Sequence, residues 1–282
     1  MADEWTFVGR KQKKSFKPKT PAAPKAPAGP AFVYTEKTVA KASKVTGVDK
    51  AIDRARTIRD AMRTSSFFAR ICNVLVAHLP LETPLQLVAY GVGSFAHGPS
   101  GNAIYQLACA SLLREFLATH EALAEAFIYD PIMTEDDNEV AAAMDLAVLE
   151  TNEQGQRTAQ TRTLFFMPHC GKQLYQNVLL SNWRSLEKVY VLGNSFAAYD
   201  DRLLVKAERA KSIFSALVPY TTEVALGPCD KKTVRDHVEY DAAFNDTSLH
   251  VFSDAQLRAA TDDGLFTRDV DAFDVGTDED LM

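Results

Sequence analysis

Residues 163–196 read TLFFMPHCGKQLYQNVLLSNWRSLEKVYVLGNSF, and this stretch decides the predicted fold. The apolar run at 163–167 has the length of a buried strand, and the PHCG turn at 168–171 ends it. Leu174, Val178 and Leu179 then recur at helical spacing, and a second apolar run at 189–192 ends at Gly193. Apolar strands that alternate with helices predict a mostly parallel sheet covered by helices on both faces.

The same alternation extends outward in both directions. Apolar runs at 85–90, 126–129, 147–149 and 222–226 predict further strands, and SLHVF at 248–252 predicts an edge strand. Helical spacing predicts helices at 48–79 (with a break at Ser65 and Ser66), 102–120, 140–144 and 203–217. We therefore expect an α/β fold with a Rossmann-like, doubly wound sheet and an N-terminal helical extension. A strand order of 3-2-1-4-5 would place the first and fourth strands side by side.

Composition divides the chain into three predicted parts. Residues 1–46, rich in Pro and Lys, predict a disordered basic arm, because such a segment buries too little apolar surface to fold. Residues 47–255 form the predicted α/β domain, with its motif core at 85–196, and 256–282 a flexible acidic tail. The arm could tether nucleic acid or be a solvated tail, and arginines along 54–70 could serve RNA or simply face solvent. A protein partner for the arm or the tail remains unidentified.

Cysteine spacing and hydropathy indicate the compartment. The four cysteines form no CxxC pair, which argues against a zinc cluster and a disulfide framework. No window approaches the roughly 18–20 apolar residues of a membrane span, and the N-terminus lacks the apolar core of a secretory signal. We expect a protein of the cytoplasm or nucleus with no membrane association.

A ligand site is expected where the parallel strands end, because α/β sheets bind ligands outside the carboxyl ends of their strands. Polar or glycine residues follow five predicted strands there. The expected binding residues are Gly91, Gly93, Ser94, Asp130, Asn152, His169, Cys170, Asn194 and Ser195.

The chemistry of this site is open. Gly91, Gly93 and Ala96 fit G-x-G-x-x-A, but the next helix starts late and no acidic residue ends a strand about 20 residues on. A looser nucleotide site and a simple tight turn both remain as interpretations of this glycine segment. Asp130 could hold a ribose hydroxyl or bond local amides. His169 is the weak candidate for an acid/base, because the side chains of neighbouring His169 and Cys170 diverge too much for a catalytic pair. We expect no metal site.

The motifs VAYGVGSF, AIYQLA, YDP, N-E-x-G-x-R (152–157), FFMPHCGKQLYQNVLLSNW and VLGNSF together resemble the SRR-like domain family. The resemblance covers about 85–196, together with the WTFVGRK opening. It implies a Rossmann-like domain with a regulatory role, in light signalling and the circadian clock in plants and in regulation of haem biosynthesis in animals. This chain has AHGPSG where members usually carry an S-S-C-type segment, and it lacks the Cys-Pro pair typical of haem regulation.

We therefore expect a soluble regulatory protein that senses a small ligand at the strand ends. The alternatives are an enzyme with a nucleotide-type or S-adenosylmethionine-type cofactor and a pure interaction module. No reaction follows from the sequence, which favours a non-enzyme. The cofactor is unknown, with a nucleotide-type ligand or haem bound through His169 and Cys170 as the open choices.

Overall fold

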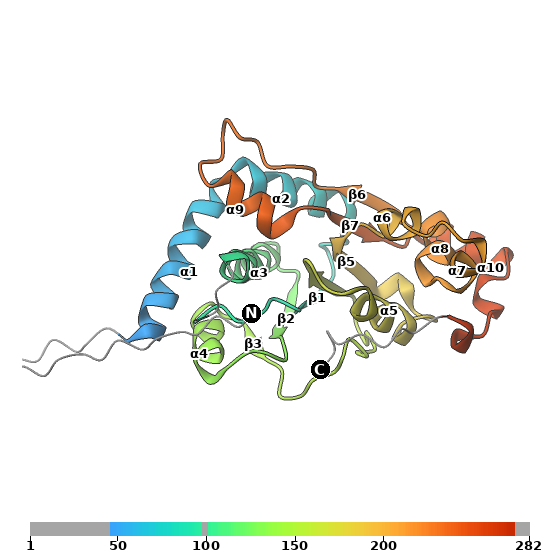
Figure 1. Ribbon diagram of the computed structural model, residues 1–282, viewed down its shortest axis with the longest axis horizontal. Helices are drawn as coiled ribbons and strands as arrows, with labels where there is room; N and C mark the ends of the chain where they lie inside the picture. Colours follow the sequence, from blue (N-terminus) through green and yellow to red (C-terminus); the bar gives the residue numbers. More distant parts are fainter. Residues whose placement is uncertain (1–45, 98–100, 274–282) are drawn as a thin grey trace, which may run out of the picture. The chain divides into compact units, whose positions relative to one another are not determined.

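The computed structural model describes residues 46–97 and 101–273 (Figure 1). These residues belong to one compact unit that spans Lys44–Met282. The predicted basic arm, apart from Thr46, and residues 274–282 lie outside the described residues.

The described residues form one seven-stranded sheet in the order β3-β2-β1-β4-β5-β7-β6. Strands β1 to β5 run parallel, whereas β7 runs antiparallel to both β5 and β6. The expected α/β class, the mostly parallel sheet and the order 3-2-1-4-5 are therefore confirmed. The strands are β1 (Leu85–Tyr90), β2 (Leu123–Tyr129), β3 (Ala147–Val148), β4 (Thr163–Met167), β5 (Val189–Asn194), β6 (Thr222–Ala225) and β7 (Thr247–Val251).

Helices cover both faces of the sheet, as the continuous apolar strands predict. Leu164 and Phe166 of β4 face one hydrophobic core, whereas Phe165 and Met167 face the other. The first core packs against α1 (Gly47–Arg63), α2 (Ser66–His78), α3 (Gly101–Thr119), α4 (Glu135–Ala143) and α9 (His237–Phe244). The second packs against α5 (Lys172–Ser181), α6 (Phe196–Asp201), α8 (Ile213–Leu217) and α10 (Asp254–Asp262), and the exposed α7 (Lys206–Lys211) precedes α8.

The break predicted between the first two helices is confirmed. The Ser65 hydroxyl accepts a hydrogen bond from the Phe68 amide, and this side-chain cap starts α2. At the other end of α1, Thr46 and Asp49 form a reciprocal capping box.

The C-terminal third differs from expectation in several places. The helix predicted at 203–217 is wrong: α7 and α8 are separate because Ser212 caps α8 through the Ser215 amide. Strand β7 is not an edge strand, because it lies between β5 and β6. Helix α9 was not predicted. Within the expected acidic tail, 254–262 is helical, and Leu265 and Phe273 are buried in the second core.

Across residues 46–97 and 101–273, no helix combines the length and the apolar character that a membrane crossing needs.

Candidate functional site

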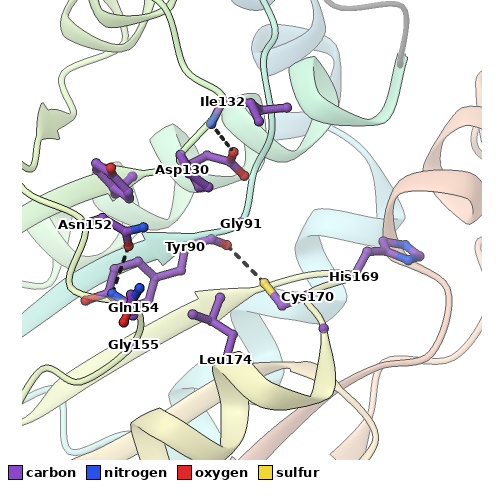
Figure 2. A pocket seen from close by; sticks show the side chains of 13 residues that line it. Tyr90, Gly91, Asp130, Ile132, Asn152, Gln154, Gly155, His169, Cys170 and Leu174 are labelled. Atoms are coloured by element: carbon purple, nitrogen blue, oxygen red, sulfur yellow. Dashed lines mark hydrogen bonds between the residues drawn. The ribbon is translucent and has the colours of Figure 1, made fainter. Parts of the chain in front are cut away.

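A cavity of about 330 Å³ opens where β1, β2 and β4 end (Figure 2). After β1 the chain crosses to β2 through α3, and after β4 it crosses to β5 through α5, which covers the other face. The cavity therefore lies at the point where the winding direction of the sheet reverses, the usual ligand position in open α/β sheets. It is lined by Tyr90, Gly91, Tyr129, Asp130, Pro131, Ile132, Asn152, Gln154, Gly155, His169, Cys170, Gly171 and Leu174.

The residue after β1 must be glycine because β4 approaches it closely. Gly91 has φ +67°, and a Cβ on it would lie 2.5 Å from the Cys170 sulfur. The Cys170 thiol donates to the Tyr90 carbonyl at 3.3 Å, which holds the two strand ends together (Figure 2). The first residue of the glycine turn is thus required by packing against Cys170.

Asp130 is held in one orientation at the cavity wall. One of its oxygens accepts the Gly93 amide at 2.8 Å, and the other accepts the Ile132 amide at 3.0 Å (Figure 2 draws the second bond). The bond to Ile132 is the local backbone bond that the sequence left open, whereas the bond to Gly93 joins two segments 37 residues apart. Each carboxylate oxygen keeps acceptor capacity beyond one amide, so these bonds also leave Asp130 able to bind a ligand hydroxyl.

The rest of the glycine turn is anchored by Asp137, which the sequence reasoning did not single out. Asp137 is fully buried and accepts the Phe95 amide at 2.8 Å, the Ala96 amide at 2.7 Å and the Ser94 hydroxyl at 2.9 Å. Burial alone would raise the pKa of Asp137, but the bonds from the Ala96, Thr134 and Phe95 amides lower it below its ordinary value. The only sequence signal was a run of acids at a helix start.

The N-E-x-G-x-R segment (152–157) contributes Asn152, Gln154 and Gly155 to the lining of the cavity. Glu153 bonds the Tyr90 hydroxyl and pairs with Arg157 at 2.8 Å, and the Arg157 guanidinium lies 5.1 Å from the centre of the Phe127 ring. Gly155 has φ +72°, and a Cβ there would lie 2.9 Å from the Leu174 carbonyl oxygen. The segment therefore holds the ends of β1 and β2 against α5.

His169 and Cys170 point in different directions. His169 adopts φ +58°, and Figure 2 shows its imidazole directed away from the other labelled side chains. His169 is exposed overall, but partial desolvation of the imidazole lowers its pKa. A hydrogen bond to the Ala243 backbone opposes this shift. The side-chain oxygen Oδ1 of Asn194 accepts a hydrogen bond from the His169 amide at 2.9 Å, and Nδ2 of the same side chain donates to the Cys170 carbonyl. Asn194 therefore braces the PHCG turn.

The structure brings some of the expected site residues together and separates others. Gly91, Asp130, Asn152, His169 and Cys170 line the cavity. Gly93 and Ser94 do not line it: the Gly93 amide bonds Asp130, and the Ser94 hydroxyl bonds Asp137. Asn194 does not line it either, and its side chain bonds the PHCG turn. Ser195 instead caps α6 and lines a different cavity of about 370 Å³.

The sequence reasoning missed the apolar part of the lining. Tyr129, Pro131, Ile132 and Leu174 supply it, and the Ile132 side chain is 62% exposed. The signal available in the sequence was Ile132, an apolar residue directly after Y-D-P, where a turn would ordinarily carry a polar residue.

The second cavity contains a carboxylate that makes the fold sensitive to acid. Burial would raise the pKa of Glu223, but hydrogen bonds from His250, Ser195 and the Ala197 amide lower it from 4.5 to about 2. Such a group stabilises the fold fully above its unfolded pKa, and this contribution is lost as the pH falls through its folded pKa. We expect Glu223→Gln to lose stability at pH 7 and to show a shallower further loss between pH 4.5 and 2. Urea midpoints at a series of pH values measure this, and an unchanged acid dependence would contradict it.

The described residues do not support a haem or metal site at the PHCG turn. They contain no group of three or more His, Cys, Asp or Glu side chains placed to hold a metal ion. The Cys170 thiol faces the Tyr90 carbonyl whereas the His169 ring turns away, so this pair does not fit a haem bound at one place.

The arginines of α1 and α2 are largely engaged within the fold. Arg63 makes a two-pronged pair with Glu115 at 2.8 and 3.0 Å, and Arg59 lies 3.4 Å from the same carboxylate. Arg70 donates to the Leu226 and Pro228 carbonyls. These bonds favour a structural role over RNA binding for this face.

The comparisons with known proteins agree on one family. A family profile described as the SRR1 domain matches residues 65–251. The chain is 36% identical over 189 residues to the Arabidopsis thaliana Protein SENSITIVITY TO RED LIGHT REDUCED 1, covering 65% of this chain and 64% of that protein. It is 35% identical over 144 residues to a Mus musculus SRR1-like protein (50% and 54% covered) and 27% identical over 225 residues to a Drosophila melanogaster one (78% and 75% covered).

The aligned region spans between about half and two thirds of the length of the Arabidopsis and mouse relatives. No solved structure matches the chain.

Proposed function

Because the chain belongs to the SRR1 domain family, we propose that it is a regulatory protein that senses a small ligand in the cavity at the strand ends. The Arabidopsis relative is named for reduced sensitivity to red light, which supports a role in light-type signalling, whereas a circadian role rests on the family resemblance. Regulation of haem biosynthesis rests on the family resemblance alone. We further propose a cytoplasmic or nuclear location, which the cysteine pattern favours.

The observation that carries the sensing proposal is the combination of one oriented carboxylate with an apolar, solvent-open wall. Asp130 is only 9% exposed and is held by two backbone amides, whereas Ile132 exposes most of its side chain beside it. A concave site with a few fixed polar groups among apolar ones is typical of small-molecule sites. Ligand contact at Ile132 would bury apolar surface that the fold itself leaves in water.

We also propose that the fold is Rossmann-like, which agrees with a ligand site at the strand ends. The parallel order 3-2-1-4-5 is that of doubly wound nucleotide-binding sheets, and the cavity lies at the reversal point between β1 and β4. The same observation favours a second candidate function, an enzyme that uses a nucleotide-type or S-adenosylmethionine-type cofactor, with His169 as acid/base. Fold alone does not assign a reaction, so this candidate rests on analogy.

A thermal-shift panel of nucleotides, S-adenosylmethionine, nicotinamide cofactors and haem tests the sensing proposal. A ligand at 100 times its dissociation constant is expected to stabilise the folded chain by about 2.7 kcal/mol. Ile132→Asp should abolish that shift with little loss of stability, because Ile132 is exposed. Val76→Asp is the matched control, since Val76 is 55% exposed and lies on α2 outside the cavity.

The outcome also separates the two candidate functions. A sensor should still bind its ligand after His169→Asn, because Figure 2 shows the imidazole directed away from the other labelled side chains and Asn tolerates a positive φ. An enzyme with His169 as acid/base should bind its cofactor but lose turnover in this variant. A chain that no member of the panel stabilises would contradict the sensing proposal.

A further inference from the structure

Three backbone amides of the glycine turn that could bind a phosphate, those of Gly93, Phe95 and Ala96, already have carboxylate partners. Phosphate-binding turns and helix N-termini work by directing free amides at the anion. Here the Gly93 amide donates to Asp130, and the Phe95 and Ala96 amides donate to Asp137. Two carboxylates of the protein therefore occupy the position of the anion in this turn.

The charges around the cavity also disfavour a phosphate. Among residues 46–97 and 101–273, those that line it include the Asp130 carboxylate and no lysine or arginine. The nearby guanidinium of Arg157 is paired with Glu153 through two hydrogen bonds of 2.8 and 2.9 Å. A phosphate group in the cavity would meet a fixed negative charge with no cation among the lining residues to offset it.

The remaining lining suits the uncharged parts of a nucleoside. Tyr129, Ile132 and Leu174 supply apolar surface of the kind on which a base packs. Asp130, fixed by two amides, offers acceptor positions for hydroxyl donors, the bond by which an acidic side chain at a strand end holds ribose. A positive charge on the ligand would be attracted to the same carboxylate.

We propose that the cavity takes a phosphate-free nucleoside, either neutral like adenosine or cationic like a nucleoside sulfonium. This inference rests on the proposed ligand-sensing function and names the chemical class of the ligand. It also distinguishes the site from dinucleotide sites, in which the glycine turn holds a pyrophosphate.

Isothermal titration of the full chain tests the proposal with adenosine, S-adenosylmethionine, ATP and NAD. We expect adenosine or S-adenosylmethionine to bind at least tenfold more tightly than ATP and NAD. Replacing adenosine with 2′-deoxyadenosine removes one hydroxyl and should weaken binding about ten- to a hundredfold, the usual loss of a hydrogen bond to a charged group. This comparison leaves the protein unchanged, so misfolding cannot mimic the effect.

Two protein variants locate the site. Ile132→Asp should weaken nucleoside binding at least tenfold, whereas Val76→Asp should leave it unchanged. Tighter binding of ATP or NAD at a site sensitive to Ile132→Asp would overturn the nucleoside class but preserve ligand sensing. Nucleoside binding that ignores Ile132→Asp, or that does not distinguish the deoxy compound, would overturn the proposal. If the chain binds none of these four compounds and no member of the thermal-shift panel, haem and nucleotides included, ligand sensing itself would be overturned.

Discussion

Replacing Asp137 with alanine is expected to lower the free energy of unfolding by about 3–5 kcal/mol, since one buried and four partly buried donors lose their acceptor together. The carboxylate bonds the Phe95, Ala96 and Thr134 amides and the hydroxyls of Ser94 and Thr134. Without it the glycine turn separates from the start of α4. Urea unfolding of the purified variant measures the change.

Two further substitutions test the cause. Glu135→Ala removes an exposed acid from the same first turn of α4 and should cost no more than about 0.5 kcal/mol. Asp137→Asn keeps one acceptor oxygen, so its loss should be intermediate. Because the pKa of Asp137 is lowered in the fold, its contribution is present above the unfolded pKa and disappears as the pH falls through the folded pKa. Equal losses for Asp137→Ala and Glu135→Ala would contradict this account.

Gly91→Ala is the second substitution with a large expected effect, a loss of about 2–5 kcal/mol. An alanine at φ +67° is strained by about 1–2 kcal/mol. Its Cβ would also lie 2.5 Å from the sulfur of the buried Cys170, and overpacking of this kind typically adds about 1–3 kcal/mol. The measurement is the free energy of unfolding from denaturant titration.

A double substitution separates the two causes. In a Cys170→Ala background the steric contact disappears and the backbone strain stays, so Gly91→Ala should cost only about 1–2 kcal/mol. Gly101→Ala is the control, because nothing lies within 4 Å of a Cβ there and the residue starts α3. An equal cost of Gly91→Ala with and without the Cys170 sulfur would rule out the steric part.

Much of the parallel half of the sheet follows from local sequence patterns. The runs at 85–90 and 163–167 become β1 and β4 with the predicted bounds, because an apolar run closed by glycine or proline is a strong strand signal. The right-handed crossover rule and the order of doubly wound sheets then place these strands side by side. Gly91, Asp130, Asn152, His169 and Cys170 meet at one cavity because they follow β1, β2, β3 and β4, which are neighbours in the sheet.

Side-chain direction and long-range partners could not be read in the same way. His169 follows β4 and Asn194 ends β5, but the positive φ of His169 and the bonds of Asn194 to the PHCG turn determine where their side chains point. Asp137 looked like an ordinary acid at a helix start until the fold placed the Phe95 and Ala96 amides against it.

The sequence by itself therefore determined the strand ends that make up the site, because hydrophobic periodicity and turn residues act over a few neighbours. The tertiary structure alone decided that β7 inserts between β5 and β6, that Ser195 belongs to another cavity, and that carboxylates satisfy the amides of the glycine turn. These features depend on contacts between segments more than about 20 residues apart, such as Phe95 with Asp137, and no local pattern encodes them.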